Sequence, residues 1–252
     1  MTAYYNEIDK GAARWLEKLI AKGLIAKGDV DTRSILDVHP EDLNGYEQLH
    51  FFAGIGGWSR ALRLAGWSDD RPVTTGSCPC QPFSSAGKGG GVSDPRHLWP
   101  AFRWLIAKRK PSIVFGEQVA SSAGREWIDG VRADLEAMGY AAGAADLCAA
   151  CVGSPQVRQR LFWVANANNN GLNNNRIAGG IEKRHATTWC DPLLPWPVTK
   201  CVVCRDGKKR RIPVEPALYP VAHGVPGRVG LLRGAGNAIV PQVAAMFIKA
   251  TA

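Results

Sequence analysis

The feature that most restricts the fold of this sequence is an alternation of short strand-like runs with amphipathic helical stripes. Apolar residues recur at three- and four-residue spacing in the helical stripes, and β-type residues cluster in the short runs between them. We expect strands at 4–9, 28–30, 49–52, 112–116 and 161–164, and helices at 12–22, 59–65, 94–106 and 131–138. Strands that alternate with helices predict an α/β fold with a mainly parallel sheet. In such sheets ligands bind at the carboxyl ends of the strands.

Composition excludes several classes of protein. With 252 residues of which 46% are hydrophobic, the chain can bury a full core, so it is not intrinsically disordered. The net charge of +9 favours a polyanionic partner, with nucleic acid as the first candidate. Seven cysteines, no apolar leader at the N-terminus and no apolar run of about 18 residues predict a soluble intracellular protein without structural disulfides.

The composition of the sequence changes near residue 166. Residues 1–165 contain nearly all the alternating strands and helices, whereas 166–175 form a polar, asparagine-rich linker. Proline-, tryptophan- and lysine/arginine-rich sequence then continues to about residue 227, and a helix follows Pro241. We therefore expect a main domain at 1–165, a small irregular lobe at 166–227, and a segment at 228–252 that packs back on the main domain.

Two segments have features that are typical of a functional site. Phe52-Ala53-Gly54-Ile55-Gly56-Gly57 joins a strand to a helix, and its glycines let backbone N–H groups approach a ligand closely. Its spacing is not that of the dinucleotide fingerprint. In the run Gly76–Ser84, Cys80 stands between two prolines and precedes a glycine-rich loop. A thiol on rigid backbone suits a nucleophile, and Cys78, two residues earlier, is its rival.

Five segments together resemble the motifs of DNA cytosine-C5 methyltransferases, in particular the compact enzymes of bacteriophages and prophages. They are Phe52–Gly57, Pro79–Ser84, Glu117–Val119, Gln156–Arg160 and Gly236–Gln242. The resemblance implies a Rossmann-like S-adenosylmethionine-dependent methyltransferase domain at 1–165 and a target-recognition lobe at 166–227. It also implies double-stranded DNA as the partner, no membrane association, a monomer, and the cytoplasm of a bacterial host.

The order of the motifs departs from the family. Two strands that carry the ribose and adenine contacts normally follow the glycine motif, but here only 60–78 separate it from Pro79. Asn6–Asp9 and Gly28–Val30 resemble the missing pair, so we predict a permutation that moves both strands to the N-terminus. Glu7 would then accept from the ribose hydroxyls and Asp29 from the adenine amino group, although both could be ordinary loop acids. If the helix after Gly57 keeps its face of the sheet, its crossover must be left-handed, which is rare.

The resemblance assigns a chemical role to each group. The Cys80 thiolate would add to C6 of cytosine, and this makes C5 nucleophilic enough to accept a methyl group. Glu117 would hydrogen-bond N3 and the amino group of the base, and Arg160 its O2, while Arg158 supports the loop or a phosphate. The target base must leave the stacked duplex, and 84–96 resembles the loop that closes behind it; an ordinary surface loop is the alternative.

The remaining site predictions fall into two sets. Cofactor contacts are expected from Phe52, Ala53, Gly54, Ile55, Gly56, Gly57, Glu7, Ile8, Asp29, Val30, Pro79, Asn237 and Ala238. DNA contacts are expected from Gln81, Ser84, Ser85, Lys88, Gln156, Lys208, Arg210 and Arg211. The basic cluster at 200–211 would bind phosphates, which position DNA without specifying its sequence; a solvated charged turn is the alternative.

Several alternatives remain open at this point. Cys148/Cys151 and Cys201/Cys204 have the spacing of zinc ligands, yet the first pair lies where related phage enzymes carry small residues, and we expect no metal. The same motifs serve a tRNA methyltransferase branch, so RNA is an alternative substrate. A catalytically silent DNA-binding relative is another, because Gln118 replaces the usual Asn. Transfer of a group other than methyl is a third.

Overall fold

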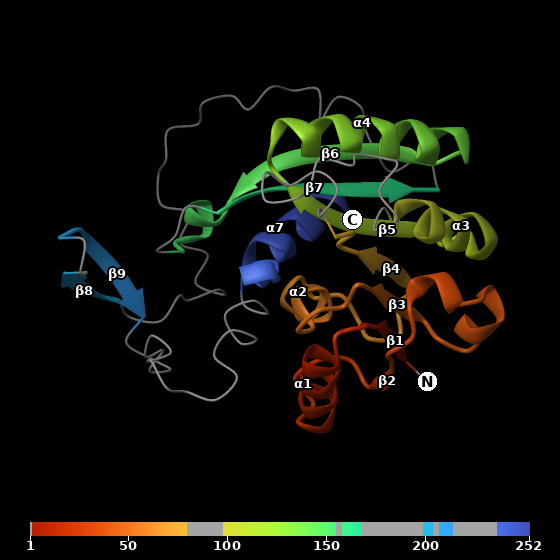
Figure 1. The fold of residues 1–252 in the computed structure, drawn as a ribbon, viewed down its shortest axis with the longest axis horizontal. Coiled ribbons are helices and arrows are strands. Elements are labelled where there is room, and N and C mark those ends of the chain that lie inside the picture. Colours follow the sequence, from red (N-terminus) through yellow and green to blue (C-terminus); the bar gives the residue numbers. More distant parts are fainter. Residues whose placement is uncertain (1, 80–97, 155–157, 168–198, 204–206, 214–235) are drawn as a thin grey trace.

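The structure is a computed structural model that describes residues 2–79, 98–154, 158–167, 199–203, 207–213 and 236–252. Its main feature is a seven-stranded sheet with the order β2-β1-β3-β4-β5-β7-β6 (Figure 1). The strands are β1 Ala3–Asn6, β2 Gly28–Asp31, β3 Gln48–Phe51, β4 Val73–Gly76, β5 Ile113–Val119, β6 Ala141–Cys148 and β7 Gln159–Asn166. The first five run parallel, and β7 runs antiparallel to both of its neighbours. The predicted α/β fold with a mainly parallel sheet is confirmed.

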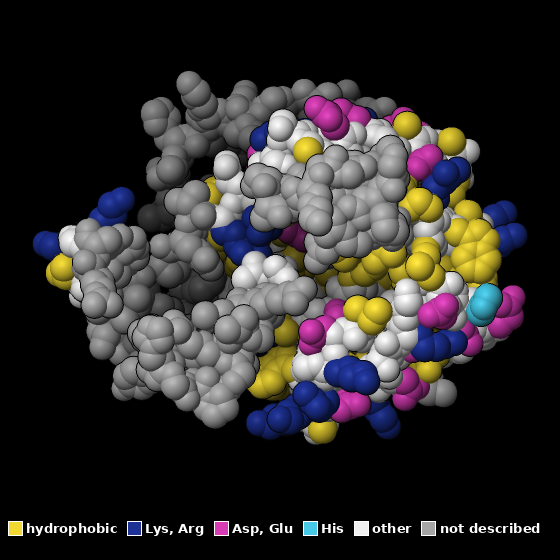
Figure 2. All heavy atoms as spheres, viewed as in Figure 1, with side chains coloured by type: hydrophobic (Ala, Val, Ile, Leu, Met, Phe, Trp, Pro, Cys, Tyr) yellow, Lys and Arg dark blue, Asp and Glu magenta, His cyan; other side chains and the backbone are white. Residues whose placement is uncertain are grey.

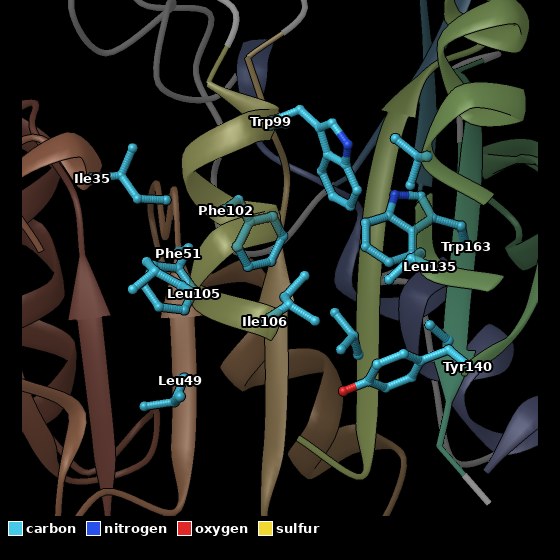
Figure 3. Packing of buried hydrophobic residues seen from close by; sticks show 14 of the residues in the cluster. Ile35, Leu49, Phe51, Trp99, Phe102, Leu105, Ile106, Leu135, Tyr140 and Trp163 are labelled. Carbon is cyan, nitrogen blue, oxygen red and sulfur yellow. The ribbon is translucent and has the colours of Figure 1, made fainter. Parts of the chain in front are cut away.

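Helices cover both faces of the sheet. They are α1 Lys10–Ala21, α2 Gly57–Leu64, α3 Trp99–Arg109, α4 Ser122–Ala137 and α7 Pro241–Thr251. Paired residues of parallel strands share a face, so Tyr5, His50, Thr75 and Phe115 form one row across the sheet. The helices α1, α2 and α7 pack on that side, here called the α1 face. The helices α3 and α4 pack on the opposite side, the α3 face, where most of the core in Figure 3 lies.

Two glycines let aromatic rings lie directly on the α3 face. Gly76 and Gly116 are paired across β4 and β5. A Cβ on Gly76 would come within 2.5 Å of the Phe102 ring, and one on Gly116 within 2.1 Å of the Trp163 indole. Both rings are buried in the core (Figure 3). Any residue with a Cβ would clash with these rings, so the two glycines allow Phe102 and Trp163 to pack directly on the sheet, next to the edge where Ser77 and Glu117 follow.

One crossover has the opposite hand to the others. The hand of a crossover reverses when either its direction along the sheet or its face is reversed. The connection β1-α1-β2 runs one way on the α1 face, and β4-α3-β5 runs the other way on the α3 face, so these two share a hand. The connection β3-α2-β4 runs in the same direction along the sheet as β4-α3-β5, but its helix packs on the α1 face. Since about 98% of such crossovers are right-handed, the one through α2 is left-handed, which the permuted order anticipated.

The second lobe is described in part. A two-stranded hairpin, β8 Thr199–Val203 and β9 Lys209–Pro213, lies apart from the main sheet (Figure 1). Most of the predicted 166–227 lobe lies outside the described residues, so its boundaries stay predictions. The helix α7 shares a hydrophobic core with α2 through Val243, Ala244 and Phe247. Within the described residues, none of the helices has the length and apolar character that crossing a membrane requires.

Candidate active site

The strands β1, β3 and β4 end level with one another, and the pairing of β4 with β5 ends in the same row. The Cα atoms of Asn6, Phe51, Gly76 and Gly116 are paired in one row across β1, β3, β4 and β5. The residue that follows each of them, Glu7, Phe52, Ser77 and Glu117, therefore lies along the same edge of the sheet. All four residues come from segments that the sequence selects as functional. This edge is the candidate active site.

The glycine turn between β3 and α2 bends sharply. Phe52, Gly54 and Gly56 have positive φ angles of 52°, 56° and 83°, and Gly56 is the N-cap of α2. Glycine adopts such angles without the strain that a Cβ imposes. A Cβ on Gly57 would lie 2.6 Å from the Ile239 side chain, so the helix N-terminus packs closely against the C-terminal segment. The turn thus exposes backbone N–H groups at the start of a helix, where an anionic or polar ligand group is favoured.

Glu7 joins the N-terminal strand to this turn. Its Oε2 accepts from the Gly54 N–H at 2.7 Å, and its Oε1 accepts from the Asp9 N–H at 2.9 Å. The two residues are 47 positions apart in the chain, and β1 brings them together because it pairs directly with β3. This is the placement that the permutation predicts. A carboxylate has about four acceptor sites, so Glu7 retains capacity for two further donors.

Asp29 does not occupy the end of its strand. It is the second residue of β2, level with Tyr4, and its carboxylate accepts from the Tyr46 hydroxyl at 2.7 Å. The strand continues because all four residues of β1 find partners in β2, and Asp31 reaches the carboxyl end instead. The expectation that Asp29 ends a strand is therefore wrong. Its role toward adenine stays a prediction.

Asp31 is held by its own ion pair. The Nη2 of Arg33 lies 2.7 Å from the Asp31 carboxylate and 3.0 Å from the carboxylate of Asp42. The Tyr4 hydroxyl donates to Asp31 at 2.6 Å. Burial acts to raise the pKa of the Asp31 carboxyl, but the hydrogen bonds from Arg33 and Tyr4 outweigh it and lower the pKa below its ordinary value. Asp31 is therefore a carboxylate over the whole neutral range. Closer to the glycine turn, Ile8 is 66% exposed beside Glu7 and Val30 is partly buried.

Glu117 forms a buried ion pair near the end of β5. Its side chain is 8% exposed, and its Oε1 lies 2.8 Å from the Nε of Arg160 on β7. Burial raises the pKa of the Glu117 carboxyl, while Arg160, a hydrogen bond from Ser77 and the charge of Arg158 act in the opposite direction. A carboxyl whose pKa is raised holds a proton more readily than a surface acid does. It can therefore donate to a ring nitrogen that gains negative charge.

Arg158, which precedes β7, and Arg160, which lies in β7, make different contacts. Arg160 pairs with Glu117, whereas the Nη2 of Arg158 donates to the carbonyls of Gly236 at 2.8 Å and Ala238 at 2.7 Å. Among the described residues, the buried Nε of Arg158 has no hydrogen-bond partner. Burial, together with the nearby Arg160, lowers the pKa of Arg158. Arg158 thus holds the C-terminal turn, in agreement with a supporting role.

The C-terminal turn carries the remaining cofactor candidates. Asn237 is exposed and Ala238 is half-buried, next to the buried Ile239 that packs on Gly57. Gln118, which follows Glu117, is buried, and its side-chain oxygen accepts from the Val119 N–H at 2.9 Å. The amide of Gln118 is therefore bound to its own strand.

The two candidate nucleophiles differ in what the structure describes. Cys78 is 6% exposed and belongs to the core on the α3 face, where a thiol has little access to a substrate. Pro79 is exposed. The following predicted site residues lie outside the described part of the chain: Cys80, Gln81, Ser84, Ser85, Lys88 and Gln156. The same is true of the side chains of Arg210 and Arg211, whereas Lys208 is exposed beside the β8–β9 hairpin.

The cysteine pairs form no metal site in the described residues. Cys148 is half-buried, and Cys151 and Cys201 are exposed. Within the described ranges, no group of three or more His, Cys, Asp and Glu side chains is arranged to hold a metal ion. Cys190 and Cys204 lie outside those ranges.

Sequence reasoning missed two features of the site. The first is a pair on the α1 face, in which the Trp58 indole N–H donates to the Ser77 hydroxyl at 3.0 Å. A serine between Gly76 and Cys78 gives no signal in the sequence. The second is a row of exposed cations along α1 at four-residue spacing: Lys10, Arg14, Lys18 and Lys22. Figure 2 shows basic side chains gathered over the lower part of the molecule, where α1 and α2 lie. The spacing was a readable signal for this second feature.

Comparison with known proteins supports the motif assignment. Residues 68–191 match the family model of the C-5 cytosine-specific DNA methylases. The type II methyltransferase M.AplI of Arthrospira platensis is 37% identical over 95 residues, which cover 37% of this chain and 28% of that protein. M.HhaI of Haemophilus parahaemolyticus, also a type II methyltransferase, is 24% identical over 200 residues, covering 64% of this chain and 61% of that protein. A solved methyltransferase of Entamoeba histolytica, EhMeth, aligns with a TM-score of 0.44 at 15% identity, over 65% of this chain and 44% of that chain.

Residues 68–191, just under half of the chain, thus match the C-5 cytosine-specific DNA methylase family. The match to the family model begins after the glycine turn, so the permuted strands that carry Glu7 and Asp29 lie outside it. The alignments with the two type II methyltransferases cover 28% and 61% of those proteins, less than two thirds of either. Similarity to this family implies S-adenosylmethionine as the methyl donor.

Proposed function

We propose that this protein transfers a methyl group from S-adenosylmethionine to C5 of cytosine in double-stranded DNA. The observation that carries the proposal is the buried Glu117–Arg160 pair at 2.8 Å, placed at the carboxyl edge of the sheet next to the glycine turn. A buried carboxyl with a raised pKa beside a cation matches what a pyrimidine ring needs when negative charge develops at N3.

The residues around the glycine turn fit S-adenosylmethionine. Glu7 accepts two backbone N–H groups and keeps acceptor sites for the two ribose hydroxyls. The N-terminus of α2 and the exposed Asn237 lie next to the turn, and Gly57 packs too closely on Ile239 for any larger residue. When bound, this cofactor supplies an electrophilic methyl group. The chain's part is to hold it at the strand ends beside the base.

The base would be activated by covalent catalysis. The Cys80 thiolate adds to C6, the C5–C6 double-bond electrons move toward N3, and Glu117 donates a proton there, so C5 becomes enamine-like. After C5 is methylated, loss of the C5 proton, departure of the Cys80 thiolate and return of the N3 proton to Glu117 restore the aromatic ring. Arg160 keeps Glu117 in place and would also face the base oxygen O2. Extrusion of the cytosine from the duplex costs a few kcal/mol, which DNA contacts must offset.

The assignment of Cys80 rather than Cys78 is directly testable. Purified protein is incubated with methyl-labelled S-adenosylmethionine and duplex DNA, and the label is located by nucleoside analysis. We expect label at cytosine C5 with the wild type and with Cys78→Ala, and none with Cys80→Ala. Transfer by Cys80→Ala at the wild-type rate, with loss in Cys78→Ala, would overturn the choice of nucleophile.

The same assay distinguishes the substrate. Duplex DNA and a tRNA transcript are offered in parallel, and label on RNA with none on DNA would refute DNA as the substrate. The small predicted lobe at 166–227 favours a short or relaxed target sequence, and bisulfite sequencing of DNA from expressing cells would contradict this by showing a long unique motif. Unchanged S-adenosylmethionine binding by Glu7→Ala and by Asp29→Ala would remove both residues from the cofactor pocket.

A further inference from the structure

Ser77 occupies a junction between three parts of the candidate site. It follows Gly76, whose partner across the sheet is Gly116, so Ser77 lies next to Glu117 at the strand ends. Side chains alternate along a strand, and both residues therefore point to the α1 face. That is the face on which α2 packs, and Trp58 is the second residue of α2. Ser77 thus touches the helix of the glycine turn and the base-binding acid, and it precedes the Cys78–Cys80 segment.

The hydrogen-bond partners of Ser77 determine where its proton points. The indole N–H of Trp58 can only donate, and its nitrogen lies 3.0 Å from the Ser77 oxygen. The serine oxygen is therefore the acceptor of this bond. Its own proton is left for the second partner, the Glu117 carboxylate, which can only accept while it is ionised. The chain of donors runs in one direction, from Trp58 through Ser77 to Glu117.

We propose that Ser77 is a positioning residue that sets the orientation of the Glu117 carboxyl relative to the N-terminus of α2. The inference rests on the proposed function, because Glu117 is there the group that contacts the base. Arg160 contacts Glu117 from β7, and the hydroxyl of Ser77, the residue that follows β4, is its other side-chain hydrogen-bond partner. With both contacts made, the carboxyl cannot rotate freely, and its remaining acceptor or proton faces the substrate.

The contact also affects the protonation of Glu117. A hydroxyl that donates to a carboxylate stabilises the charged form and so opposes the effect of burial. Removal of the hydroxyl by Ser77→Ala should therefore raise the pKa of Glu117 further. A residue that merely fills space between two strands would leave this titration unchanged, since the volume of the side chain changes little.

The test follows the Glu117 carboxyl directly. The side-chain carboxyl carbons of glutamate are labelled with carbon-13, the Glu117 signal is assigned with Glu117→Gln, and its titration is recorded by NMR without DNA or S-adenosylmethionine. We expect an upward shift in Ser77→Ala, restoration in Ser77→Thr, and a smaller upward shift in Trp58→Phe. The phenylalanine keeps the ring packing on Phe115 and loses the indole N–H.

Ser59→Ala provides the matched control. Ser59 is another buried serine of α2, and its hydroxyl contacts Tyr5 and the Ala26 N–H, away from Glu117. We expect this variant to leave the Glu117 titration unchanged. A Glu117 titration that is the same in Ser77→Ala and wild type refutes the inference, as does an equal shift in Ser59→Ala. If Ser77→Ala does not fold, the comparison of Trp58→Phe with wild type decides.

Kinetics separate this inference from the proposed function. In Ser77→Ala we expect kcat to fall about 10- to 100-fold, the effect of one lost hydrogen bond to a charged group, with the KM for DNA nearly unchanged. Because the NMR titration requires no turnover, a wild type that transfers no methyl would refute the function and leave the positioning of Glu117 intact. Wild-type activity with no change of kcat in Ser77→Ala would refute the positioning role alone.

Discussion

His50 should make the stability of this protein depend on pH between 8 and 5. The residue lies in β3 with 1% of its surface exposed, and its ring stacks on Tyr5 at 4.9 Å. The amide nitrogen of Gln48 donates to the Ser68 carbonyl, so the Gln48 oxygen faces the Nε2 of His50, at 3.3 Å, and accepts its proton. The Nδ1 of His50 then accepts from the Thr75 hydroxyl at 2.8 Å. Both ring nitrogens are satisfied in the neutral form.

The magnitude follows from the shift in pKa. Burial lowers the pKa of His50 from 6.5 to about 3. Above pH 6.5 the residue is neutral in the folded and unfolded states and adds no pH dependence. Below pH 6.5 the unfolded state takes up the proton first, so the free energy of unfolding falls by about 1.4 kcal/mol per pH unit. The loss due to His50 is about 2 kcal/mol at pH 5 and about 4 kcal/mol at pH 3.

Urea denaturation at pH 8 and pH 5 measures this effect. The wild type and His50→Gln are compared by the change in unfolding free energy between the two pH values, which cancels the cost of the substitution itself. We expect the variant to lose about 2 kcal/mol less than the wild type over this range. An identical pH dependence in wild type and His50→Gln would refute the assignment of His50 as a buried neutral side chain.

Three further substitutions probe the site and its support. Arg160→Leu should lower the free energy of unfolding by about 3–5 kcal/mol near pH 8 because it leaves Glu117 as a buried unpaired charge. Adding Glu117→Gln should recover part of this stability. The loss in Arg160→Leu should also shrink as the pH falls toward 4.5 and Glu117 is protonated. Gly116→Ala should cost about 1–3 kcal/mol or more, measured by thermal unfolding, because its Cβ would lie 2.1 Å from a buried indole. Gly57→Ala should weaken S-adenosylmethionine binding in calorimetry, because the added carbon pushes the C-terminal segment off the start of α2. Gly130→Ala, an exposed helical position with open space around it, should show neither loss and is the control for both glycines; losses of equal size there would contradict the steric argument.

The sequence by itself determined the local elements and selected the candidate site. The spacing of apolar residues follows from the geometry of a single helix or strand, so it predicted the alternation of strands and helices and their order. The short gap between Gly57 and Pro79 predicted that two strands come from the N-terminus, and β1 lies beside β3 with Glu7 on Gly54. The motifs around Glu117 and Arg160 selected the two side chains that form the buried pair.

The tertiary structure alone decided how those elements combine. That Asp29 lies within β2 depends on its pairing with β1, and the left-handed crossover depends on which face α2 covers. The contact of Ser77 with Trp58 and the hold of Arg158 on the C-terminal turn join residues 19 and about 80 positions apart. Such contacts arise when strands take up a register and helices choose a face, and both follow from packing across the whole core, which no local pattern encodes.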